Sequence, residues 1–116
     1  NELPDLVDFF FQDQLSFLAE ELIQKGMDSN KTASCIEITI NKLENIAAWD
    51  SINIEHVLRP EADSLGIKTG QLFGTLRIAL TGKKVAPPLF DTMEVLGKST
   101  CLKRLNEALK LVEYVD

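Results

Sequence analysis

The feature that most constrains this chain is the spacing of its apolar residues, which recur every three or four positions in several short segments. Leu72, Leu76 and Leu80 form the clearest of these stripes. Intervals of three and four residues place side chains on one face of an α-helix, whereas a half-buried β-strand needs strict alternation. The spacing therefore predicts a chain built from amphipathic helices.

Three further stripes share this spacing. They consist of Phe11, Leu15, Leu18 and Leu22; of Ile36, Ile40, Leu43 and Ala47; and of Leu102, Leu105, Leu109 and Val112. No segment sustains strand alternation between hairpin turns. The predicted fold class is therefore all-α, a compact bundle or cage of five to seven helices.

Residues that start and stop helices lie between these stripes. Cap oxygens for the second stripe are offered by Asp28, Ser29 and Asn30, and Asn53 is expected to cap a third segment. Pro60 interrupts that segment because proline lacks the amide hydrogen that a helix needs. The glycines expected to end helices are Gly26, Gly66, Gly82 and Gly97.

The charge of the chain is divided between its halves. Residues 1–63 have a net charge of −9, residues 64–116 have +3, and the whole chain has −6. The total argues against a nucleic-acid binder, but such asymmetry is also a hint of contact with a polyanion. A basic face can act locally because salt screens exposed charges beyond about 10 Å. An ordinary solvated surface remains the alternative, and Ser64 marks the only candidate boundary between two small subdomains.

Several classes of protein are excluded or disfavoured. No run of about 18 apolar residues is present, so no membrane span is expected. The first residues, from Asn1 to Asp5, show neither an initiating Met nor a secretory signal and suggest a piece of a longer gene. Cys35 and Cys101 lack paired spacing, which favours reduced thiols and a cytoplasmic location.

Catalytic motifs are also missing from the sequence. His56 is the only histidine, no G-x-S-x-G nucleophile motif occurs, and no His or Cys spacing suits a metal. Thr81-Gly82-Lys83-Lys84 lacks the pattern of a phosphate-binding loop. No catalytic residue, metal or cofactor is therefore predicted for this chain.

Three blocks in the second half are specific in combination: Leu76-Arg77-Ile78-Ala79-Leu80-Thr81-Gly82, then Pro87-Pro88-Leu89-Phe90, then Leu96-Gly97-Lys98. Together they resemble the C-terminal anticodon-binding region of bacterial-type glutamyl-tRNA synthetases, which are class I enzymes. The resemblance is strong over 58–105 and weaker over 1–57. It implies an acidic helical subdomain at 1–63 and a basic anticodon-binding subdomain at 64–116.

The resemblance also implies a function and partners. The expected partner is the anticodon loop of glutamate tRNA, with no role for DNA or a membrane. Glutamate activation, with ATP and Mg, is expected in an upstream catalytic domain of the same polypeptide, because this chain lacks that domain's His-Ile-Gly-His and Lys-Met-Ser-Lys-Ser type motifs. The chain alone is therefore not expected to be active as a ligase.

Candidate RNA-binding residues follow from the same resemblance. Arg59 and Arg77 match RNA-facing arginines of the family, and a guanidinium can read a base edge, stack on a base or grip a phosphate. The turn at Ala86, Pro87 and Leu89 is expected to meet an unstacked base. The predicted phosphate contacts, which position RNA without reading its sequence, are Lys83, Lys84, Lys98, Lys103 and Arg104.

Structural interpretations of these residues stay open at this point. The alternative for Arg77 is a surface position or an internal ion pair, and that for Arg59 is a helix-end cation favoured by the dipole. Phe73, Phe90, Trp49 and Tyr114 are expected to be core aromatics. The main rival function is a helical protein–protein interaction module that uses the acidic half. A small hydrolase using His56 as its base is a more distant rival.

Overall fold

The computed structural model describes residues 17–82 and 88–113 of the chain. Within those ranges every regular element is a helix, so the predicted all-α fold is confirmed there. The helices are α2 (Ala19–Leu22), α3 (Ser29–Glu44), α4 (Ser51–Leu58), α5 (Glu61–Leu65), α6 (Thr69–Thr81), α7 (Leu89–Leu96) and α8 (Lys98–Glu113). None of these helices combines the length and the apolar character needed to cross a bilayer.

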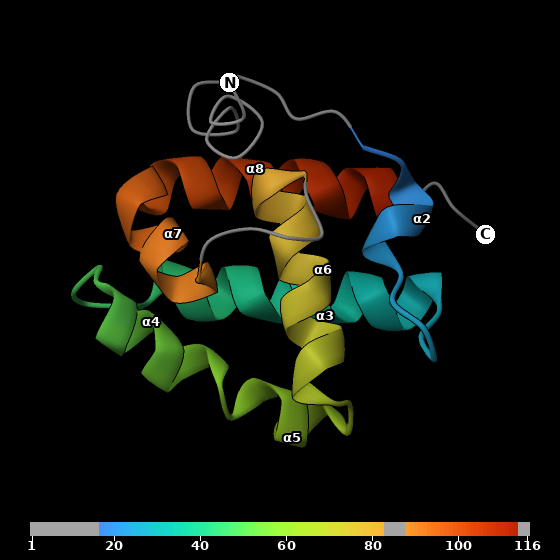
Figure 1. Cartoon of the computed structure of the whole chain (residues 1–116), viewed down its shortest axis with the longest axis horizontal. Coiled ribbons are helices and arrows are strands. Elements are labelled where there is room, and N and C mark those ends of the chain that lie inside the picture. The colour runs from blue at the N-terminus through green and yellow to red at the C-terminus, as the bar shows by residue number, and fades with distance from the viewer. Residues whose placement is uncertain (1–16, 83–87, 114–116) are drawn as a thin grey trace.

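Two long helices organise the fold. Helices α3 and α8 lie alongside each other, and α6 crosses in front of them and contacts both (Figure 1). Helices α4 and α7 pack together at one end, while α2 lies at the other end against α6 and α8. This arrangement leaves one side of α6 on the surface, bordered by α4 and α5.

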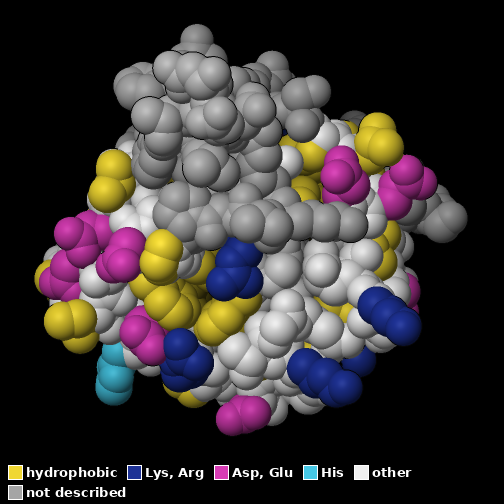
Figure 2. Space-filling model, viewed as in Figure 1, with side chains coloured by type: hydrophobic (Ala, Val, Ile, Leu, Met, Phe, Trp, Pro, Cys, Tyr) yellow, Lys and Arg dark blue, Asp and Glu magenta, His cyan; other side chains and the backbone are white. Residues whose placement is uncertain are grey.

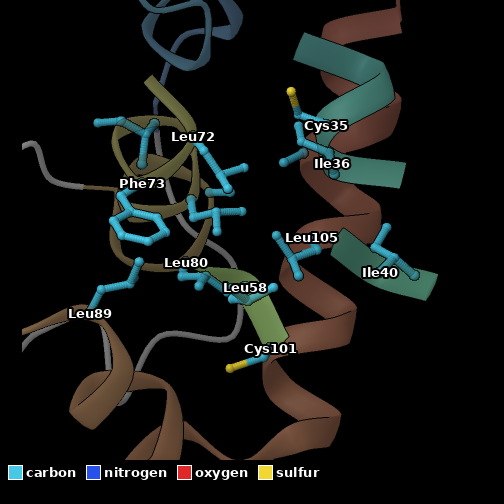
Figure 3. Packing of buried hydrophobic residues seen from close by; sticks show 14 of the residues in the cluster. Cys35, Ile36, Ile40, Leu58, Leu72, Phe73, Leu80, Leu89, Cys101 and Leu105 are labelled. Carbon is cyan, nitrogen blue, oxygen red and sulfur yellow. The ribbon is translucent and has the colours of Figure 1, made fainter. Parts of the chain in front are cut away.

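The predicted stripes supply the core. Leu72, Leu76 and Leu80 of α6 are completely buried. Figure 3 shows Leu72 directed from α6 toward Ile36 of α3, whereas Phe73 is directed to the other side, toward Leu89. Neighbouring positions on α6 therefore serve two purposes, because one face packs toward α3 and the adjacent face packs toward α7.

Several predicted helix boundaries are confirmed. The carboxylate of Asp28 accepts a hydrogen bond from the Lys31 amide at 2.7 Å and caps α3. Gly66 and Gly82 end α5 and α6 with φ values of 72° and 73°, a left-handed conformation that costs glycine little. The proline break is also present, because α4 ends at Leu58 and α5 begins after Pro60.

Three local predictions were wrong. Leu18 is 63% exposed and lies before α2 in extended backbone, where its amide donates to the Glu21 carboxylate at 2.7 Å. Ala47 is exposed because α3 ends at Glu44. Asp50, rather than Asn53, caps α4, since its carboxylate accepts from the Asn53 amide at 2.8 Å. The rest of the first predicted stripe, Phe11 and Leu15, lies outside the described residues.

The subdomain boundary near Ser64 stays a prediction. A single buried cluster contains Ile36 and Leu58 from before that position and Leu76 and Leu105 from after it. The two charge-divided halves therefore share one hydrophobic core within the described residues.

Candidate nucleic-acid interface

Arg59 lies at the C-terminal end of α4 and is fixed on two sides. Its Nε donates to the Glu55 carboxylate at 2.8 Å, one turn earlier in the helix. Its guanidinium carbon lies 5.6 Å from the centre of the Phe73 ring and 5.8 Å from that of Phe90. Cation–π attraction of this kind favours a defined position for the charge. The side chain nevertheless remains 56% exposed, so its remaining donors face solvent.

Phe73 and Phe90 form the platform under this arginine. Their ring centres are 5.2 Å apart and their planes are perpendicular, an edge-to-face arrangement that aromatic pairs prefer. Phe73 comes from α6 and Phe90 from α7. The position of Arg59 therefore depends on three helices that are distant in the sequence.

Arg77 lies on α6 four residues after Phe73, and this interval places two residues on the same face of a helix. It is half-buried. Within 17–82 and 88–113, its guanidinium makes neither a hydrogen bond nor an ion pair. Arg59 is thus held over the aromatic pair, whereas Arg77 lies one turn after Phe73 on α6 and has no hydrogen-bond or ion-pair partner among the described residues.

The surrounding surface is mixed in character. On the face shown in Figure 2, Lys and Arg side chains border a hydrophobic area, while Asp and Glu side chains lie mostly toward the edges. A shallow hollow beside Arg59 is lined by Ile52, Glu55, His56, Arg59, Pro60 and Asp63. Apolar faces next to fixed cations are what an unstacked base and its phosphate need.

The other predicted contacts are distributed unevenly. Lys83, Lys84, Ala86 and Pro87 lie outside the described residues. Leu89 begins α7 and is only 3% exposed, because its side chain belongs to the core. Lys103 is exposed on α8. Lys98 donates to the carbonyl oxygens of Glu44 and Ile46 at 3.1 and 3.4 Å and so stabilises the end of α3.

Arg104 is in the wrong place for the predicted phosphate contact. It is only 3% exposed, and its Nη1 donates to the Leu80 carbonyl oxygen at 2.6 Å. Burial lowers the pKa of this guanidinium, while the nearby Cys101 and Glu107 oppose the shift. Its role in this structure is to connect α8 with the last turn of α6.

The aromatic platform was only partly foreseen. The sequence predicts Phe73 and Phe90 as core residues, and Phe73 is indeed only 7% exposed. Their contact with Arg59 was missed. The sequence held no signal for it, since the interval of four between Phe73 and Arg77 indicates a shared helix face only for those two residues. Trp49 packs against the core and donates to the Met93 carbonyl oxygen at 2.9 Å, and Tyr114 lies outside the described residues.

The described residues show no arrangement for metal binding, since no group of three His, Cys, Asp or Glu side chains converges among them. Both cysteines are buried. Burial raises the pKa of the Cys35 thiol to about 11 and that of Cys101 to about 12. Both thiols are therefore neutral and poor nucleophiles at neutral pH.

The fold and this surface together define an all-helical domain with one exposed cation, Arg59, over two aromatic rings. Comparison with known families gives the assignment: residues 1–109 match the anticodon binding domain family. The chain therefore belongs to that family of anticodon-binding domains.

Similar proteins are consistent with this assignment. The chain is 41% identical over 111 residues to a glutamate–tRNA ligase of Roseiflexus castenholzii and 41% identical over 109 residues to one of Dehalococcoides mccartyi. These alignments cover 96% and 94% of this chain but only 22% of each relative. The chain thus spans about a fifth of the length of the curated relatives it matches.

A solved structure shares the fold. The glutamate tRNA ligase of Elizabethkingia meningosepticum, crystallised with its amino acid, superposes with a TM-score of 0.78 over 96% of this chain and 22% of that one. The sequence identity is 20%, so this likeness concerns the fold alone.

Proposed function

We propose that this chain is the anticodon-binding part of a glutamate–tRNA ligase and that it recognises the anticodon loop of glutamate tRNA in translation. The observation that carries the proposal is the position of Arg59 over the Phe73 and Phe90 rings, with Arg77 one turn after Phe73 on α6, within a domain of the anticodon-binding family. The ligase names of its relatives support the choice of tRNA.

The proposed mechanism is recognition without chemistry. Anticodon bases are unpaired and can splay out, so a protein can stack against them and bind their edges. Arg77, whose guanidinium has no partner among the described residues, can donate to a base edge or phosphate, and a charge-assisted hydrogen bond is stronger than a neutral one. Arg59 adds a second cation whose position is fixed by Glu55 and the two rings.

The remaining parts of the reaction are assigned to other regions. In this proposal, glutamate activation with ATP and Mg takes place in a catalytic domain upstream in the same cytoplasmic polypeptide. Binding of the anticodon here would orient the acceptor end of the tRNA toward that domain. The 116-residue chain alone is therefore expected to bind tRNA without charging it.

The test is a titration of the chain with a glutamate-tRNA anticodon stem-loop and with a stem-loop whose anticodon is scrambled. We expect tighter binding to the cognate loop. Arg77→Ala should weaken cognate binding about tenfold, the cost of losing a charge-assisted contact of about 1.4 kcal/mol. Lys110→Ala, which removes an exposed charge on α8, is the matched control and should change affinity less than twofold.

Two results would contradict the proposal. Equal binding of both loops by the wild type would remove base recognition and leave only contact with phosphates. Absence of binding by a sample that circular dichroism shows to be folded would reject RNA recognition. A helical protein–protein module would then be the better reading, and the exposed Ile52 and Val95, on the packed helices α4 and α7, would be its first candidates for contact.

A further inference from the structure

The first residue of α5 is a fully buried carboxylate. Glu61 has no exposed surface, and its Oε2 accepts a hydrogen bond from the Thr39 hydroxyl at 2.7 Å. Its other oxygen, Oε1, has no hydrogen-bond partner among the described residues. A buried carboxylate that is only half satisfied is costly, because water would otherwise solvate both oxygens.

Stability does not explain this residue. Burial raises the pKa of Glu61, and the Thr39 hydrogen bond and the charge of Lys42 only partly oppose that shift. Replacing a buried charged group with an apolar side chain of similar volume is often neutral or stabilising. Such a group can instead fix the orientation of the segment that carries it, because a hydrogen bond has a preferred geometry and apolar burial has none.

The place of Glu61 in the chain indicates which segment is oriented. It follows Arg59 by two residues, with the helix-breaking Pro60 between them. Leu58 and Ala62 are buried on either side of this junction, but apolar contacts alone leave the junction free to rotate slightly. The Thr39–Glu61 hydrogen bond connects the junction to the long helix α3.

Arg59 is sensitive to that rotation. Its guanidinium lies over rings from two other helices, at 5.6 and 5.8 Å from their centres. Cation–π contacts of this kind are favourable within about 6 Å, so a shift of the junction away from the rings would weaken both contacts of Arg59.

We propose that Glu61 is a positioning residue for RNA recognition: through Thr39 it fixes the 58–62 junction so that Arg59 lies over Phe73 and Phe90. The inference rests on the proposed function, since Arg59 is its point of contact with RNA. Glu61 itself touches no RNA in this scheme, because it is buried.

The experiment compares two replacements of Glu61. Glu61→Gln keeps an oxygen that accepts the Thr39 hydrogen bond and removes only the charge, so binding to the cognate stem-loop should stay within twofold. Glu61→Met keeps the length and loses the acceptor, so affinity should fall about fivefold although the melting temperature is unchanged or higher. Asp63→Asn, on the exposed side of the same short helix, is the control for charge removal.

Two further measurements link any loss to Arg59. In an Arg59→Ala background, Glu61→Met should cause no additional loss, because the two changes act through one contact. NMR of the free protein should show ring-shifted Arg59 side-chain protons in the wild type, Glu61→Gln and Asp63→Asn, and their return toward ordinary values in Glu61→Met. This second readout needs no RNA.

If Glu61→Met fails to fold, Thr39→Val removes the same hydrogen bond from the α3 side and takes its place in each measurement. Wild-type affinity in the Met or Val variant, losses that add to that of Arg59→Ala, or unchanged Arg59 resonances would each overturn the positioning role. Failure of the wild type to bind RNA would instead reject the proposed function, while the NMR comparison would still report on the geometry.

Discussion

Single residues at this surface differ in how their charge is used. Arg59 is exposed but already engaged with Glu55 and two aromatic rings, whereas Arg77 is half-buried with no described partner for its guanidinium. A pre-positioned cation loses little entropy on binding, and an unpaired one loses no existing partner. In the proposed function, the two arginines would therefore contribute to RNA binding in different ways.

Glu61 leads to a prediction about pH. Its pKa is raised in the folded state, chiefly by burial, so the folded protein holds this proton more tightly than the unfolded chain does. The contribution of protonated Glu61 to the stability of the folded state is complete below the ordinary pKa of about 4.5. It is lost as the pH rises through the raised value. On α3, the nearby Cys35 thiol stays neutral across this range, because burial raises its pKa to about 11.

The measurement is thermal unfolding between pH 4 and pH 8 for the wild type and Glu61→Gln. The variant should gain melting temperature relative to the wild type as the pH rises, because its side chain stays neutral. The Asp63 carboxylate is exposed, so the Asp63→Asn variant should show no such trend. A constant difference between wild type and Glu61→Gln across the range would mean that the buried carboxyl does not titrate there.

At the scale of helices, the junction between α6 and α8 supports a prediction about Arg104. Its hydrogen bond to the Leu80 carbonyl is buried, and losing a charged partner of a buried group costs about 1.5–3 kcal/mol. Arg104→Met should lower the free energy of unfolding in urea by about that amount. Lys110→Met on the exposed side of α8 should change it by less than about 0.5 kcal/mol. A purely RNA-binding arginine would show no loss of stability.

Helices were predictable from the sequence where the spacing of apolar residues alone determined them. Leu72, Leu76 and Leu80 on α6 followed the expected spacing because core packing and helix period agreed there. Leu18 and Ala47 failed because a local hydrogen bond or an early helix end overrode the same spacing. Spacing reports which face a residue would occupy if the helix continued, and it says little about where a cap will stop it.

At the scale of the whole molecule, the sequence predicted individual residues of the candidate site but not how they are arranged in space. Arg59 and Arg77 could be named from motifs, but the aromatic platform under Arg59 depends on α4, α6 and α7 coming together. The same limit applied to Arg104, whose place in a basic run gave no sign that it would point inward. Long-range packing decides which cations of a helix are available to RNA.

The net negative charge of the chain and the two arginines of the candidate interface together predict how binding to the stem-loop responds to salt. Each phosphate contact releases counterions, so the slope of log affinity against log salt changes by about 0.7 per contact with a single strand. If Arg59 and Arg77 both contact phosphates, the double alanine variant should have a slope smaller in magnitude by about 1.4. Titrations of the cognate stem-loop between 50 and 300 mM potassium chloride, chosen as roughly bracketing physiological ionic strength, would measure it.

Lys110→Ala separates local contact from overall charge, because it also makes the net charge of −6 more negative while lying on α8, away from the aromatic pair. Its slope should equal that of the wild type. A decrease in the control about half as large as that in the double variant, which loses two charges rather than one, would show that the chain responds to its total charge. An unchanged slope with lower affinity in the double variant would place both guanidinium groups on bases rather than phosphates, since base contacts release few counterions.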